Sequence, residues 1–144
     1  MKLKFFLLTA IVLPLILLTA CGPSGPQIRI EDAWIRPDPL WENAAGYFTL
    51  FNDGNESDLL LAVSISISGS ESLHQTVMEG DVHKMLPVER LEIAPGKTVA
   101  FEPMSYHAML VELEAGLEYG QTTTMIFEFE QSGEIEIQAE IRAE

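Results

Sequence analysis

Polar and apolar residues alternate most regularly between positions 134 and 141. Isoleucine or alanine occupies every odd position of this segment, and glutamate or glutamine occupies every even one. Since successive side chains of a β-strand point to opposite faces, this alternation predicts an antiparallel strand with one face buried and the other in water.

Eight other segments have the length and apolar content of strands. Turn-forming Gly, Pro, Asn, Asp and Ser residues separate several of them, and no segment shows the period of an amphipathic helix. The pattern therefore predicts an all-β fold, an antiparallel β-sandwich. The predicted strands are 27–35, 47–52, 59–67, 73–78, 83–88, 98–101, 108–113, 122–129 and 134–141. The expected core residues are Trp34, Phe48, Leu60, Val63, Phe101, Leu110, Phe127 and Phe129.

The first 20 residues have the composition of a secretory signal peptide. Lys2 and Lys4 precede an apolar run, residues 5–18, that is shorter than the ~20 residues needed to span a bilayer. The Leu-Thr-Ala-Cys sequence at 18–21 resembles the lipobox of bacterial lipoproteins, which implies that Cys21 is lipidated. The alternative is an ordinary signal peptide with Cys21 at its cleavage site by chance. We expect an exported protein, anchored by its lipid to the outer face of a bacterial membrane, in the periplasm or at the cell surface.

The rest of the chain divides into a tether and one domain. Residues 21–26 comprise Cys21 and a stretch of Gly, Pro and Ser that favours neither helix nor strand. Residues 27–144 are enough for one domain with a single hydrophobic core. We expect this domain to lie close to the membrane that holds Cys21.

The chain is strongly acidic, with 22 acidic and 8 basic side chains and a formal net charge of −14. It lacks the Lys and Arg that neutralise phosphates, which excludes nucleic acid as a partner. Cys21 is the only cysteine, so no disulfide forms within the chain. Since Cys21 is assigned to the lipid, the domain also lacks the thiolate ligand of a blue-copper electron carrier.

Histidine and methionine cluster between positions 74 and 109, a stretch that holds all three histidines and four of the six methionines. Imidazole nitrogen and thioether sulfur suit Cu(I), whereas calcium and magnesium prefer oxygen ligands. His107 and Met109 are two positions apart, so on a strand they share a face and present one nitrogen and one sulfur side by side. Met85 and His74, from neighbouring strands, could supply the rest of a four-ligand set.

The spacing of these four residues resembles a family signature. Ten residues separate His74 from Met85, and 21 separate Met85 from His107, which begins a His-x-Met sequence. This pattern is similar to that of periplasmic copper chaperones of the PCu(A)C type, and the similarity extends over roughly residues 28–142. The flanking sequences that also resemble the family are 32–36, 44–48 and 93–96.

The resemblance implies a cupredoxin-like, Greek-key β-sandwich that binds Cu(I) outside the cytoplasm. His74, Met85, His107 and Met109 would be its ligands. We expect one ion per chain, because no His- and Met-rich tail follows the domain as it does in some relatives. The implied recipient is the copper A centre in subunit II of cytochrome c oxidase, reached directly or through a thioredoxin-like assembly protein. We expect the protein to be a monomer.

Three further side chains are candidate auxiliary ligands: His83, Met78 and Met104. His83 precedes Met85 by two positions and so shares its face on a strand. It either adds a nitrogen to the metal site or lies at its rim without a bond to the metal. Met78 and Met104 either supply additional sulfur or pack in the wall of the pocket.

Two other functional classes need to be weighed. One is a structural or adhesive β-sandwich lipoprotein, in which the histidines and methionines have no metal role. The other is an enzyme, but the chain has no Gly-x-Ser-x-Gly nucleophile motif, and two thioethers favour Cu(I) over oxygen activation. We therefore expect a non-enzymatic copper chaperone.

Overall fold

The computed structural model describes residues 24–114 and 116–143. The regular structure in these residues is β-strand, and none of them forms a helix that could cross a membrane. The predicted signal peptide (1–20) and lipidated Cys21 lie outside the described residues. The prediction of an all-β fold is confirmed.

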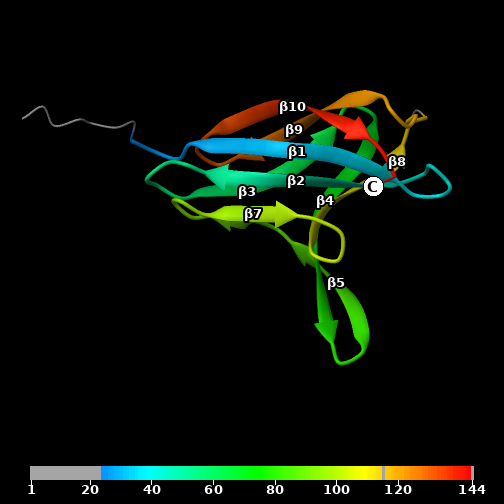
Figure 1. Cartoon of the computed structure of the whole chain (residues 1–144), viewed down its shortest axis with the longest axis horizontal. Coiled ribbons are helices and arrows are strands. Elements are labelled where there is room, and N and C mark those ends of the chain that lie inside the picture. The colour runs from blue at the N-terminus through cyan, green and yellow to red at the C-terminus, as the bar shows by residue number, and fades with distance from the viewer. Residues whose placement is uncertain (1–23, 115, 144) are drawn as a thin grey trace, which may run out of the picture.

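The described residues form one continuous hydrogen-bonded sheet of ten strands (Figure 1). Its order is β5-β4-β8-β7-β2-β1-β10-β9-β3-β6, with an additional pairing between β8 and β2. Nine of the strands coincide with predicted segments, and β6 escapes prediction because three residues are too few to show an alternation. The strands are β1 (Ile28–Pro37), β2 (Ala44–Asn52), β3 (Asp58–Ile65), β4 (Ser68–Glu79), β5 (Val82–Val88), β6 (Leu91–Ile93), β7 (Thr98–Phe101), β8 (Tyr106–Leu113), β9 (Thr122–Phe129) and β10 (Gly133–Ile141).

Two neighbouring strand pairs are parallel, so the prediction of a purely antiparallel arrangement is wrong at these places. β1 runs parallel to β10, with Ile35 opposite Ile141, and β7 runs parallel to β8 where Phe101 lies opposite Tyr106. The other ladders are antiparallel. The parallel pair of β1 and β10 joins the first and last strands of the domain.

The sheet curls so that its inner face encloses one hydrophobic core. Phe48 of β2 and Phe127 of β9 are separated in the sheet by β1 and β10, yet their ring centroids are 4.7 Å apart. Gly46 of β2 and Met125 of β9 are also close across the core, since a Cβ at position 46 would lie only 2.9 Å from Met125 Cε. The two halves of the curled sheet therefore pack face to face, as the layers of a sandwich do.

Trp34 is the one expected core residue that is not buried. β1 contains a bulge between Glu31 and Trp34, with Asp32 at a φ of 51°. Because a bulge shifts the alternation of the strand by one residue, Ile35 becomes the core residue, at 0% exposure, and Trp34 moves to the outer face. There Trp34 packs on Tyr47, with ring centroids 4.5 Å apart.

The hairpin of β4 and β5 extends beyond the rest of the sheet (Figure 1). The ladder between β4 and β8 ends at Gln75, and the residues of β4 after Gln75 form a ladder with β5 alone, although the Thr76 N–H still donates to the Ser105 carbonyl. Residues 76–85 therefore form a two-stranded projection, which we call the hairpin arm. Most of its side chains are exposed.

Candidate metal centre

The four predicted ligands share the outer face of the neighbouring strands β5, β4 and β8. His74 of β4 lies directly opposite His107 of β8. Met109 is two residues from His107 on the same strand, and Met85 of β5 lies opposite Thr76, two residues from His74. Since residues two apart on a strand, and residues directly opposite in a ladder, lie on the same face, the register alone brings the four side chains together.

Three of the four line one cavity of about 220 Å³ on this face: Met85, His107 and Met109. His74 does not line the cavity, but its ring centroid is 5.8 Å from that of His107. The structure therefore places two thioethers and one imidazole around the cavity and the second imidazole beside it. The other lining residues are Arg36, Ala45, Tyr47, Thr76 and Met104.

The two imidazoles differ in their hydrogen bonds. His107 is 6% exposed, and its Nδ1 lies 3.2 Å from the carbonyl oxygen of Ser105. A proton on this Nδ1 is donated to the carbonyl, which leaves the lone pair of Nε2 free for a metal ion. The Nδ1 of His74 is buried and has no hydrogen-bond partner among the described residues. A buried polar atom without a partner costs free energy. A metal ion bound to the Nδ1 of His74 would remove that cost.

The surroundings of His107 keep its side chain neutral. Burial lowers the pKa of His107, the hydrogen bond to the Ser105 carbonyl raises it, and the nearby His74 and Arg36 lower it further. The net result is a pKa below the ordinary value for histidine, which is about 6.5. Since metal ions bind the neutral imidazole, this shift favours the binding form at neutral pH.

Sequence reasoning did not assign Arg36 and Tyr47 to the site, although both line the cavity. Arg36 Nη2 donates a hydrogen bond to Tyr47 Oη at 2.7 Å, and the guanidinium carbon lies 5.2 Å from the centre of the Tyr47 ring. Both residues fall in the flanking sequences 32–36 and 44–48, so the family resemblance already included them. Their position at the cavity depends on the pairing of β1 with β2, which the sequence pattern does not predict.

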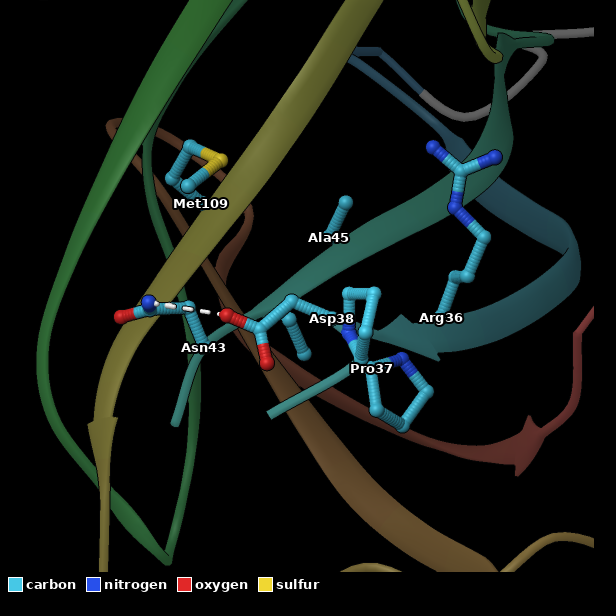
Figure 2. Close-up of a pocket in the computed structure, with 8 residues that line it drawn as sticks. Arg36, Pro37, Asp38, Asn43, Ala45 and Met109 are labelled. Carbon is cyan, nitrogen blue, oxygen red and sulfur yellow. Dashed lines mark hydrogen bonds between the residues drawn. The ribbon is translucent and has the colours of Figure 1, made fainter. Parts of the chain in front are cut away.

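A second cavity, of about 460 Å³, adjoins the first and shares Arg36, Ala45 and Met109 with it. One side of it is formed by the turn after β1, where Asn43 Nδ2 donates a hydrogen bond to Asp38 at 3.1 Å (Figure 2). Two backbone N–H groups of the same turn also donate to the Asp38 carboxylate. Met109 therefore lies between two hollows of the surface. The residues lining the second cavity are Arg36, Pro37, Asp38, Pro39, Asn43, Ala44, Ala45 and Met109.

The three auxiliary candidates lie in two different places. Met104 lines the first cavity and is 61% exposed, with a φ of 69° that residues other than glycine seldom adopt. Met78 and His83 lie opposite each other on the hairpin arm and do not line the cavity. The structure thus brings Met104 to the candidate centre and leaves Met78 and His83 beyond it.

The candidate centre relies on methionine sulfur for half of its ligands. Among the residues that the structure describes, no three side chains of the types His, Cys, Asp and Glu are grouped closely enough to hold a metal ion. A centre that joins two imidazoles to two thioethers is chemically suited to a soft monovalent ion.

The fold matches solved structures that include PCuAC domains and copper-loaded proteins. The apo PCuAC domain from PmoF1 is 26% identical, covers 85% of this chain and 98% of its own, and superposes with a TM-score of 0.69. The copper-bound PCuAC domain from PmoF2 is 24% identical, with 85% and 97% coverage and a TM-score of 0.68. Cu(I)-bound DR1885 from Deinococcus radiodurans is 23% identical, with 77% and 75% coverage and a TM-score of 0.59. The chain therefore has the fold of the PCuAC domains.

Comparison of the sequence with known families and proteins identifies the family of this chain. The family model "Putative lipoprotein LpqE-like" matches residues 28–141, and the chain therefore belongs to the LpqE-like family. The uncharacterized protein RP573 of Rickettsia prowazekii is 31% identical over 113 residues, which is 75% of this chain and 62% of the relative. "Putative lipoprotein Lxx21020" of Leifsonia xyli is 26% identical over 109 residues, 75% of this chain and 65% of the relative. The chain thus spans slightly less than two thirds of these relatives.

Proposed function

We propose that this protein is an extracytoplasmic Cu(I) metallochaperone, which binds one ion through His74, Met85, His107 and Met109 and passes it to an acceptor protein. The register of β4, β5 and β8 carries the proposal, because it directs two imidazoles and two thioethers to one face, with Met85, His107 and Met109 around one cavity and His74 beside it. Neutral nitrogen and thioether sulfur match the preference of Cu(I).

The same geometry favours release as well as binding. Met85 is 59% exposed, whereas His107 is almost fully buried. An incoming ligand from another protein can therefore approach the ion from the side of Met85, while His107 still holds the ion. Stepwise replacement of ligands in this way transfers the ion without its release into water.

The compartment and the recipient are part of the proposal. The match to a lipoprotein family supports export and attachment to a membrane through Cys21. We propose as acceptor the copper A centre in cytochrome c oxidase subunit II, or a thioredoxin-like assembly protein that serves it. We further propose a monomer with cupredoxin-like Greek-key connectivity and a binding role rather than a catalytic one.

Cu(I) should stabilise the domain against heat. A ligand that binds only the folded state adds about 2.7 kcal/mol when its free concentration is 100 times the Kd, which raises the Tm of a domain of this size by at least about 5 °C. Anaerobic melting scans of the apo domain with and without Cu(I) measure the effect. An unchanged Tm would instead favour a structural or adhesive lipoprotein without a metal role.

The affinity for Cu(I) should fall below about pH 6, because protons compete with the metal for imidazole nitrogen. The lowered pKa of His107 moves the onset of its protonation below the ordinary value of about 6.5. Competition titrations at a series of pH values test this, and a Met85→Leu variant, which keeps both imidazoles, should show the same slope. An affinity that is constant from about pH 7.5 to pH 5 contradicts ligation by histidine.

A further inference from the structure

The outer face of the hairpin arm carries two methionines and a histidine that packing does not explain. Met78 and His83 lie directly opposite each other, and Met85 follows His83 by two residues on the same face. Met78 and Met85 are each 59% exposed, and His83 is exposed as well. Methionine commonly fills gaps inside a core, but side chains this exposed fill none.

Met85 lies between these residues and the four-residue centre. Its partner in the ladder is Thr76, so its diagonal neighbours on the same face of β4 are His74 on one side and Met78 on the other. Diagonal neighbours are about 7–8 Å apart at the backbone, within reach of long side chains. Because methionine is unbranched and rotates freely, one thioether can bond to an ion at either place.

The other face of the arm has a different chemistry. Lys84 lies opposite Val77 and forms an ion pair with Glu79. The soft ligands of the arm are therefore all on the face that continues into the candidate centre. The arm is also the part of the sheet that projects furthest from the body of the domain (Figure 1).

We propose that Met78, His83 and Met85 form a second, transient Cu(I) site, through which the ion enters and leaves the four-residue centre. This inference rests on the proposed function. During transfer the ion keeps its bond to the Met85 sulfur and its single positive charge. Bonds to the His83 nitrogen and the Met78 sulfur form as the bonds to the other three ligands break. No electron is transferred, and the exchange replaces one set of neutral donor atoms by another.

Methyl NMR of the whole domain, labelled at its methionine methyl groups, tests the location of the second site. During an anaerobic titration with Cu(I), the first equivalent should shift the signals of Met85 and Met109. Excess Cu(I) should then shift the signal of Met78, which does not line the cavity that receives the first ion. The Met125 signal, from the buried core, should stay in place throughout.

Transfer kinetics test the role of the site. The combined variant Met78→Leu and His83→Gln should bind the first ion as tightly as the wild type, but should release it to a chromophoric chelator about tenfold more slowly, a change of about 1.4 kcal/mol in the barrier. Leu86→Ala provides a matched control, because Leu86 is exposed next to the arm, on the opposite face of β5, and should leave the rate unchanged.

The outcomes separate this inference from the proposed function. A Met78 signal that stays fixed in excess Cu(I), or a combined variant that transfers at the wild-type rate, overturns the arm site even if the first ion binds normally. If the Met85 and Met109 signals also stay fixed and no ion binds, the proposed function itself is wrong.

Discussion

Cu(I) affinity should fall by about a thousandfold when His107→Gln and Met109→Leu are combined, a loss of about 4 kcal/mol of binding free energy. The two changes remove one nitrogen and one sulfur from the proposed set of four while keeping side chains of similar size. Exchange of Met for Leu usually costs less than about 1.5 kcal/mol of stability, so the fold should persist. Anaerobic competition against a chelator of known affinity measures the loss, and thermal unfolding of the apo-protein checks the fold.

Met125→Leu is the matched control for this variant. Met125 is 0% exposed on the inner face of β9 and packs near Gly46, so the control removes a thioether without touching the cavity. Its Cu(I) affinity should equal that of the wild type. If the combined variant folds and binds Cu(I) within about twofold of the wild type, His107 and Met109 are not ligands, and the proposed function fails.

Most strands could be predicted from the sequence, because alternation and turn residues are local signals. The pairing of strands that are distant in the sequence could not be predicted from such local signals. The parallel pairing of β1 with β10 joins segments about a hundred residues apart along the chain, and no local pattern encodes it. The bulge before Trp34 is a related case, because one extra residue reverses the alternation that places tryptophan in the core.

The candidate site, like the fold, could be predicted from the sequence only in part. The spacing from His74 to Met109 points to a group of ligands through family resemblance, but the direct opposition of His74 and His107 is a matter of strand register. Register depends on which strands pair, so Arg36 and Tyr47 could not be assigned to the cavity before β2 was seen to pair with both β8 and β1. Sequence reasoning thus identified residue types suited to the chemistry, and the structure supplied their neighbours.

Asp58→Ala should lower the free energy of unfolding by about 3 kcal/mol, because it removes a buried charged acceptor of several hydrogen bonds. Asp58 is 1% exposed at the start of β3. Its carboxylate accepts hydrogen bonds from the backbone N–H groups of Gln131 and Ser132, both at 2.9 Å, and from that of Leu59 at 2.8 Å. The carboxylate therefore ties β3 to the turn between β9 and β10, and alanine would leave these donors without an acceptor. Denaturant unfolding of the apo-protein measures the loss.

Asp53→Ala is the control for the general effect of removing a carboxylate from this acidic chain. Asp53 pairs with Arg29 at 2.9 Å, but both side chains are about half exposed, and exposed ion pairs contribute little to stability. Asp53→Ala should therefore change the unfolding free energy far less than Asp58→Ala. Equal losses in the two variants would contradict a special role for the buried carboxylate.

The contribution of Asp58 should also depend on pH. Burial raises the pKa of Asp58, but hydrogen bonds from Ser132, Gln131 and Leu59 lower it by more, so the pKa lies below its ordinary value. A carboxyl with a depressed folded-state pKa stabilises the fold above its unfolded pKa, about 3.9, and that contribution is lost as the pH falls through the lower folded value. The two curves of stability against pH for wild type and Asp58→Ala should therefore converge below about pH 4.

Asp58 lines neither cavity, so folded Asp58→Ala should bind Cu(I) like the wild type. A weakened affinity in that variant would show that the centre depends on the packing of β3 as well as on the register of β4, β5 and β8.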